Sequence, residues 1–315
     1  MAIILAGDVG ATKTLLSLVD GEQTYTERYA TSDFANLADL VQRFLAGCGV
    51  RPDIACFGVA GPVLNNSAYL TNVGWHISAP DLERALHIPR VILINDFMAI
   101  AYGILQLSPT ALLCLQRGEP IPQAPIAVLG AGTGMGQAYL TWGAQGYQVH
   151  PSEGGHTDFA PRNDRELLVW QYLRQKYERV CVEHIVSGQG ITNIYEALGG
   201  VREQPAKIAQ AGSDASDPIA VETMELFVSA YGSEAGNLAL KILPYGGLYV
   251  AGGIAPQILS WLTTGDRFLQ AMLTKGKVGR LLQDIPTYIV LNPEVGLRGA
   301  LFLAQRWECG QITKS

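Results

Sequence analysis

Two glycine-rich turns in the sequence carry amide and hydroxyl groups of the kind that bind phosphate. The first is Asp8-Val-Gly-Ala-Thr-Lys-Thr14, and the second is Gly130-Ala-Gly-Thr-Gly-Met-Gly136. Neither has the G-x-x-x-x-G-K-S/T pattern of a P-loop, and the G-x-G-x-x-G spacing of a dinucleotide-binding turn fails at Met135. Apolar runs flank both turns, so each predicts a β-hairpin whose N–H groups and threonine hydroxyl can bind anionic oxygens.

Each turn on its own is better explained as an ordinary tight β-turn. Two such turns facing each other, however, would bind a polyphosphate from both sides. The carboxylate of Asp8 could then hold a hydrated Mg²⁺. Together the two turns therefore predict a nucleotide site.

Asn95 and Asp96 stand where an apolar strand ends and a helix begins. This is the carboxyl edge of a strand, where α/β sheets usually bind their ligands. A single Asx residue here would be an ordinary helix N-cap. Because two are adjacent, one can cap the helix while the other acts as a base.

Glu153 and His156 are separated by two glycines, which allow a sharp bend, so both side chains could contact one small polar ligand. A turn with exposed polar residues explains the same pattern. Glu183 precedes an apolar run and Ser187-Gly-Gln-Gly190, and on its own it predicts a surface helix residue.

The elements that position these groups alternate between strands and helices, which predicts an α/β fold. Strands are expected at 3–6, 15–19, 54–60, 91–94, 126–130, 137–142 and 248–251. Helices are expected at 37–45, 97–105, 165–177, 191–197, 220–243 and 297–307. The looser, proline-rich segment 107–125 is the best candidate for the crossing between the two lobes, and the last helix is expected to fold back on the first lobe.

Length and charge limit the classes of protein that the chain can belong to. Its 315 residues predict two domains with a cleft: a small one at 1–107, completed by 296–315, and a large one at 108–295. The formal net charge of −6 provides no basic surface for nucleic acid or an anionic membrane. We expect neither as a partner.

The chain is expected to be cytoplasmic. Its N-terminus lacks the basic region of a secretory signal, and prolines and glycines interrupt the uncharged stretch between Lys241 and Asp266 too often for a spanning helix. The five cysteines are odd in number and scattered without a C-x-x-C pair, so we expect them to be reduced and mostly in the core.

Seven segments, taken in order, resemble the bacterial glucokinase family from one end of the chain to the other. They are Asp8-Val-Gly-Ala-Thr-Lys-Thr14, Leu70-Thr-Asn-Val-Gly-Trp75, Ile94-Asn-Asp-Phe97, Gly130-Ala-Gly-Thr-Gly134, Glu153-Gly-Gly-His156-Thr-Asp-Phe-Ala-Pro161, Glu183 with Val186-Ser-Gly188, and Val250-Ala-Gly-Gly-Ile254. The ordered set is far more specific than any one member. The resemblance implies an α/β, two-lobed actin-like ATPase (ribonuclease H-like) fold with a cleft between the lobes and a phosphate turn in each.

The resemblance also implies a role for each matching residue, with ATP and Mg²⁺ as cofactors. Asp96 would be the catalytic base, and Asp8 would hold the magnesium ion through water. The sugar hydroxyls would be bound by Asn95, Asp96, Glu153, His156 and Glu183. The nucleotide would be bound by Asp8, Gly10, Ala11, Thr12, Lys13, Gly132, Thr133 and Gly134, with Gly252 and Gly253 at the adenosine.

Two residues depart from the family pattern. Ala11 stands where the family usually has a second glycine, and Lys13 stands where it often has asparagine. Lys13 resembles the neighbouring ROK family of sugar kinases, but the zinc-binding cysteine cluster of that family does not occur in this sequence. The bacterial glucokinase family is the closer match.

The activity that the resemblance implies is the transfer of phosphate from ATP to D-glucose by a homodimeric enzyme. Two alternatives stay open on the sequence. One is a kinase for another hexose, which a panel of hexoses would reveal. The other is an actin-like ATPase that needs no sugar, which sugar-dependent release of ADP would separate from a kinase.

Overall fold

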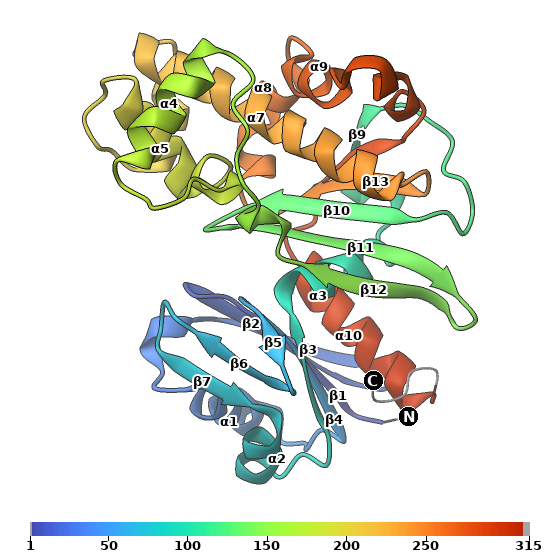
Figure 1. Ribbon diagram of the computed structural model, residues 1–315. Helices are drawn as coiled ribbons and strands as arrows, with labels where there is room; N and C mark the ends of the chain where they lie inside the picture. Colours follow the sequence, from blue (N-terminus) through green and yellow to red (C-terminus); the bar gives the residue numbers. More distant parts are fainter. Residues whose placement is uncertain (1, 311–315) are drawn as a thin grey trace. The chain divides into compact units, whose positions relative to one another are not determined.

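The computed structural model describes residues 2–310, which form two compact units (Figure 1). Among the described residues, the first unit comprises 2–109, 143–151 and 292–310, and the second comprises 110–142 and 152–291. Segment 143–151 groups with the first unit, whereas we expect it in the large domain at 108–295 from the sequence. In the described part of the chain, no helix combines the length and apolar character needed to cross a membrane.

The first unit is built on a five-stranded sheet in the order β3-β2-β1-β4-β8. Its strands are β1 (Ile4–Val9), β2 (Lys13–Asp20), β3 (Gln23–Ala30), β4 (Ile54–Val59) and β8 (Val91–Asn95). A small sheet joins β5 (Val63–Leu64), β6 (Ser67–Leu70) and β7 (Trp75–Ser78). The helices are η1 (Thr31–Asp33), α1 (Leu37–Cys48), α2 (Ala79–Leu86), α3 (Asp96–Ile104) and α10 (Val295–Glu308).

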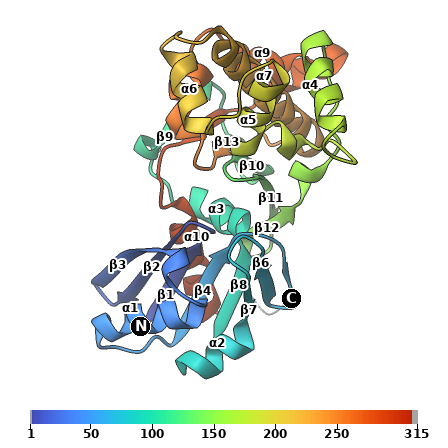
Figure 2. The ribbon, with the colours of Figure 1, turned by 90° about the vertical axis from the view of Figure 1, so that its left-hand side faces the viewer.

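The two faces of this sheet follow from side-chain alternation along its strands. Leu5, Phe57 and Leu93 project from one face into a core shared with α1 and α2. The opposite face meets α3 and α10, which also pack on each other, as the two views show (Figures 1 and 2). The expectation that the last helix folds back on the first lobe is therefore confirmed.

The second unit carries five strands that neighbour one another in the order β11-β10-β13-β14-β9. They are β9 (Leu112–Gln116), β10 (Ile126–Ala131), β11 (Met135–Gly143), β13 (Gly247–Ala251) and β14 (Thr287–Val290). The strand that precedes β11 in the order of the same sheet, β12 (Gly146–Ser152), groups with the first unit except for its last residue. The α-helices are α4 (Asp164–Arg174), α5 (Gly188–Ala197), α6 (Pro205–Ser213), α7 (Pro218–Ile242), α8 (Leu259–Thr263) and α9 (Arg267–Leu273). Short 3-10 helices lie at η2 (Pro109–Ala111), η3 (Gly154–His156), η4 (Val182–His184), η5 (Ala255–Ile258) and η6 (Gly276–Leu282).

Both predicted glycine hairpins are present. Strand β1 pairs antiparallel with β2 up to Val9 opposite Thr14, and β10 pairs with β11 up to Ala131 opposite Met135. In each sheet the hairpin strand then pairs in parallel with a more distant strand, β4 or β13. The chain thus builds the same hairpin device once in each unit.

Segment 107–125 contains the point where the chain passes from the first unit, which ends at 109, to the second, which begins at 110. It also contains β9, which pairs antiparallel with β14 despite the surrounding prolines. One expectation is wrong. The cysteines are free, but they are not mostly core residues: Cys56 and Cys181 are buried, Cys48 is half-buried, and Cys114 and Cys309 are exposed.

Candidate functional site

The first group of candidate residues lies at the carboxyl ends of β1, β4 and β8, which are neighbouring parallel strands. Asn95 is the N-cap of α3, and its Oδ1 accepts hydrogen bonds from the N–H groups of Phe97 at 2.9 Å and Met98 at 3.3 Å. Its Nδ2 donates to the carbonyl of Gly61, at the end of β4, at 3.1 Å. The predicted capping role therefore belongs to Asn95, which also ties α3 to the neighbouring strand.

Asp96 begins α3, and its carboxylate is held by its neighbours. Oδ1 accepts from Asn95 Nδ2 and from the N–H of Phe97, both at 2.9 Å. The side chain is half-buried at the positive end of the helix, where a carboxylate is favoured. Asp96 is thus an oriented acceptor next to a capped helix end, as a general base requires.

Asp8 lies near the end of β1, on the sheet face that meets α10. A Cβ atom at Gly296 would stand 3.0 Å from Asp8 Oδ2, so the glycine at the start of α10 leaves room at this carboxylate. Burial raises the pKa of Asp8, and the positive charge of Lys13 partly opposes that effect. A bound cation would favour the charged carboxylate in the same way as Lys13, but more strongly.

The first glycine turn is held from outside by Thr31. The N–H of Gly10 donates to the carbonyl of Lys13 at 3.0 Å, and Thr31 Oγ1 donates to the carbonyl of Gly10 at 2.8 Å. Within the described chain, no residue accepts a hydrogen bond from the N–H groups of Ala11 and Thr12. These two donors are therefore available to an anion. Ala11 does not adopt a positive φ, so alanine fits here without the strain that would favour glycine.

The second glycine turn lies in the second unit and is packed against two other glycine segments. The N–H of Gly132 donates to the carbonyl of Gly134 at 2.8 Å, and the N–H of Gly188 donates to the carbonyl of Gly132 at 2.9 Å. Gly252, with a φ of +83°, lies so close to this turn that a Cβ atom would stand 2.5 Å from the carbonyl oxygen of Ala131. The structure therefore brings the predicted phosphate turn and the predicted adenosine segment together.

Glu183 links this turn to the predicted sugar residues. It lies in η4, where its Oε2 accepts a hydrogen bond from the N–H of Met135 at 2.8 Å. A Cβ atom at Gly134 would fall well inside 3.0 Å of the same oxygen. The interpretation as a surface helix residue is wrong, because Glu183 is half-buried and its carboxylate accepts a hydrogen bond from the backbone at the end of the glycine turn.

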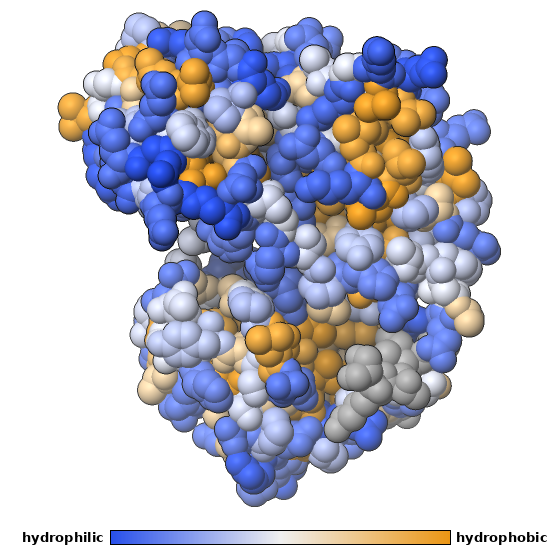
Figure 3. All heavy atoms as spheres, viewed as in Figure 1, coloured by the Kyte–Doolittle hydropathy of each residue, from blue (hydrophilic) through white to orange (hydrophobic). Residues whose placement is uncertain are grey.

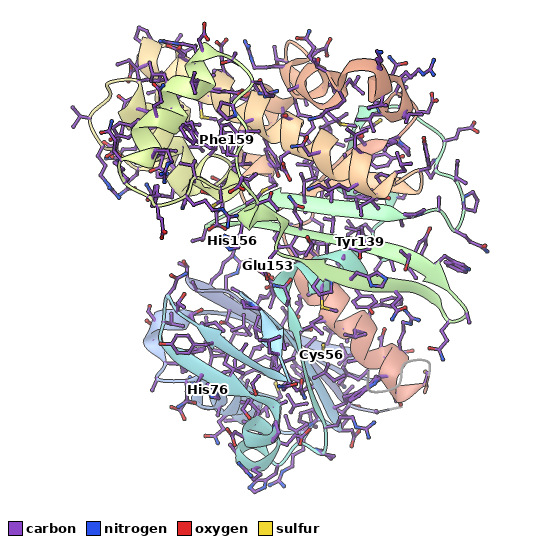
Figure 4. The ribbon with its side chains drawn as sticks, viewed as in Figure 1. Cys56, His76, Tyr139, Glu153, His156 and Phe159 are labelled. Atoms are coloured by element: carbon purple, nitrogen blue, oxygen red, sulfur yellow. The ribbon has the colours of Figure 1, made fainter. Side chains whose placement is uncertain are left out.

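Glu153 and His156 flank η3, directly after β12, and both labelled side chains come from this short segment (Figure 4). Glu153 Oε2 and His156 Nε2 are 3.9 Å apart, with 62% and 59% of the side chains exposed. Helices η3 and η4 contact each other, and the N–H of Val182 donates to the carbonyl of Thr157 at 2.9 Å. Glu183 therefore stands beside this exposed pair.

His184 was not singled out from the sequence, although it adjoins Glu183. Its ring stacks on Tyr177 with a centroid separation of 3.9 Å, and its Nδ1 accepts from the N–H of Cys181 at 3.2 Å. Burial lowers the pKa of His184, Glu183 opposes that shift, and His156 adds to it. His184 thus holds η4 in place through its stacking on Tyr177 and its hydrogen bond from Cys181.

A separate cavity of about 760 Å³ lies within the first unit. Its apolar lining includes Ile92, Met98 and Trp307, and Figure 3 shows apolar residues gathered in a hollow between β5 and α10. Arg306 also lines it, but its guanidinium donates to the carbonyls of Tyr147 at 3.0 Å and Gln145 at 2.6 Å. This cavity contains none of the predicted site residues.

A hairpin turn in each of two α/β units, with carboxylates at the strand ends beside them, defines the two-lobed actin-like ATPase fold of the sugar kinases. The chain matches the family model described as glucokinase over residues 5–307. It is 45% identical to the glucokinase of Trichormus variabilis, over 97% of this chain and 100% of that protein. The chain therefore belongs to the glucokinase family.

Solved structures agree with this assignment. The crystal structure of a glucokinase from an Antarctic psychrotroph matches with a TM-score of 0.85 and 29% identity, covering 97% of this chain and 99% of that one. A ROK family glucokinase from Streptomyces griseus, solved in complex with glucose and AMPPNP, matches with a TM-score of 0.66 and 20% identity, covering 96% and 99%. The latter likeness concerns the fold.

Proposed function

We propose that this protein transfers the γ-phosphoryl group of ATP to the 6-hydroxyl of D-glucose. The relative from Trichormus variabilis carries the name of that activity, and the Streptomyces griseus structure holds glucose with an ATP analogue. The observation that carries the proposal is the oriented Asp96 carboxylate, fixed by Asn95 and by the start of α3. An actin-like ATPase without a sugar acceptor would have no need of the further polar side chains, Glu153 and His156, that are proposed to bind the sugar.

In the proposed mechanism, Asp96 accepts the proton of the 6-hydroxyl as that oxygen attacks the γ-phosphorus and ADP leaves. A positioned general base contributes about 10² to 10⁴ in rate. Asn95, Glu153, His156 and Glu183 bind the sugar hydroxyls. Phosphoryl transfer depends mainly on positioning and on stabilising charge, so holding the hydroxyl in line is the main task of these residues.

The phosphates are proposed to bind at the two glycine turns. Gly10, Ala11, Thr12 and Lys13 serve in the first unit, and Gly132, Thr133 and Gly134 in the second, with Gly252 and Gly253 at the adenosine. The N–H groups of Ala11 and Thr12, which find no acceptor within the described chain, support this assignment. Such donors stabilise charge that develops on the phosphate oxygens.

Asp8 fits the magnesium ion that the family implies. A single carboxylate whose charged form burial disfavours suits Mg²⁺, which keeps several waters and takes its other ligands from phosphates. Bound there, Mg²⁺ would neutralise charge on the triphosphate. The residue that would hold it is Asp8, through water.

Family membership also leads us to propose a cytoplasmic homodimer that supplies glucose 6-phosphate to glycolysis. The domain division proposed with it is 1–107 completed by 296–315, and 108–295. Light scattering after size-exclusion chromatography would measure the mass of the assembly. A monomer at all concentrations would refute the dimer without affecting the kinase activity.

The decisive experiment combines a panel of hexoses with Asp96→Asn. With ATP and Mg²⁺, D-glucose should have the highest kcat/KM, with mannose lower and galactose poor, because an epimer leaves polar groups of the site unpaired once the bound sugar covers them, at a cost of roughly 1–3 kcal/mol each. Asp96→Asn should lower kcat by about 10² or more while changing the KM for glucose little, because the amide keeps the shape but cannot accept the proton. Near wild-type turnover in that variant would remove Asp96 from the role of base.

A further inference from the structure

A chain of hydrogen-bonded polar side chains begins at Gln137, next to the Glu153–His156 turn, and continues through the second unit to Lys275. Gln137 on β11 is 2% exposed and Glu234 on α7 is 4% exposed. Gln137 Nε2 donates to Glu234 Oε1 at 2.8 Å, and Asn237 Nδ2 donates to Glu234 Oε2 at 2.9 Å. Lys275 Nζ then donates to Asn237 Oδ1 at 2.6 Å. Both oxygens of the buried carboxylate are thus satisfied.

This chain fixes which way the Gln137 amide points. A carboxylate only accepts hydrogen bonds, so the nitrogen of Gln137 must face Glu234 and its oxygen must face away. That oxygen lies against Gly154, where a Cβ atom would fall far inside 3.0 Å of it. The neighbouring Gly155 lies equally close to the carbonyl oxygen of Met135 on the same strand. The turn between Glu153 and His156 therefore rests on β11 through Gln137 and Met135.

Packing alone does not explain a carboxylate and an amide in this place. Burying a charged group costs several kcal/mol even after relaxation, and a pair of apolar side chains of the same volume is often as stable or more stable. What the polar pair adds is a single orientation for the Gln137 amide. That amide contacts the turn carrying Glu153 and His156.

We infer that Gln137, held by Glu234, is a positioning residue that sets the place of the Glu153–His156 turn and so controls affinity for the sugar. The inference rests on the proposed function of that turn. Neither Gln137 nor Glu234 touches substrate in this scheme. They act through Gly154, and their loss should affect the sugar rather than the nucleotide.

The test is the double variant Gln137→Met with Glu234→Met, which replaces the polar pair by apolar side chains of similar length. It should remain folded, because the amide and the carboxylate are removed together and Lys275 keeps its hydrogen bonds to Ser233 and Asn237. Its KM for glucose should rise about tenfold, since a displacement of even 1 Å can cost about 10² in rate, while its KM for ATP should stay within about twofold of wild type. Unchanged glucose KM in the folded variant overturns the inference, as does an equal rise in both KM values. Should the double variant not fold, Glu234→Gln is measured in the same way, because it removes the buried charge and with it the fixed orientation of the Gln137 amide while keeping the side-chain volume.

Thr223→Val is the matched control on α7. Thr223 is fully buried, and within the described chain its Oγ1 has no hydrogen-bond partner, so its loss disturbs the helix without touching the polar chain. Both KM values should remain those of wild type. The NMR signals of the His156 ring, assigned with His156→Gln, provide a readout without substrate. The His156 signals should shift in the double variant and stay in place in Thr223→Val. Unshifted His156 signals in the double variant overturn the inference, and this result does not depend on whether the hexose panel supports or refutes the proposed kinase.

Discussion

Adding a single methyl group at Gly134 would test whether Glu183 couples the phosphate turn to the sugar residues. In Gly134→Ala, the new Cβ would lie inside 3.0 Å of Glu183 Oε2, whereas ordinary contact begins at 3.4 Å. The carboxylate must therefore retreat by more than about 0.4 Å. Its 2.8 Å hydrogen bond from the N–H of Met135 would then exceed the usual limit of about 3.2 Å.

The expected magnitude follows from that one bond. A hydrogen bond to a charged group contributes about 1.5–3 kcal/mol. Since about 1.4 kcal/mol corresponds to a factor of ten, kcat/KM for glucose should fall by about 10- to 100-fold. Because Glu183 also contacts the second glycine turn, where the phosphates are proposed to bind, the KM for ATP should rise as well.

Initial rates measured over a grid of glucose and ATP concentrations separate these effects. Gly143→Ala is the matched control, because it makes the same substitution at the other end of β11, where the nearest atom to a new Cβ is 3.8 Å away. Its kinetics should match wild type. If Gly134→Ala kept the wild-type kcat/KM for glucose while remaining folded, Glu183 would not couple the two parts of the site.

Two further outcomes follow from named side chains. Asp8→Asn should raise the Mg²⁺ concentration needed for half-maximal rate while leaving glucose binding nearly intact. Separate titrations of Mg²⁺ and glucose would measure the two effects. Weakened glucose binding with normal Mg²⁺ dependence would contradict the assignment of Asp8 to the magnesium ion. Lys275 should make the free energy of unfolding depend on pH. Burial lowers the pKa of Lys275 to about 8, an effect that Arg162 strengthens and Glu234 opposes, whereas the ordinary value is about 10.4. Between these two pH values the unfolded state binds more protons than the folded state, so stability should rise with pH there. Urea unfolding at about pH 7 and pH 10 should show this rise in wild type relative to Lys275→Met, and parallel curves would exclude it.

Local pattern was enough to predict the elements that carry the site. The glycine hairpins at Asp8–Thr14 and Gly130–Gly136 could be predicted because each turn and its two flanking strands are contiguous in sequence. In both hairpins the flanking strands pair antiparallel in the structure. The start of α3 could be predicted for the same reason, since Asn95 caps N–H groups two and three residues away. Strand β9 could not, because its pairing with β14 joins residues far apart in sequence.

The supporting residues of the site escaped prediction because their partners are distant. Thr31 holds the first turn across 21 residues, and Gln137 meets Glu234 across 97. Glu183 precedes an apolar run that is typical of a helix, and only the fold reveals that its carboxylate accepts from Met135, 48 residues earlier. No spacing in the sequence encodes these pairs, since each depends on which elements become neighbours.

Three of the glycines allow close contacts between the backbone and polar side chains of the proposed site or its support. At Gly296, Gly134 and Gly154, the missing side chain is what lets a backbone segment approach Asp8, Glu183 or Gln137. In each case the neighbour is a polar group of the proposed site or its support. Because a Cβ would have to displace that group, glycine here fixes the position of a functional side chain rather than loosening the chain. The same close approach makes single methyl additions a sharp probe of a site whose chemistry depends on placement.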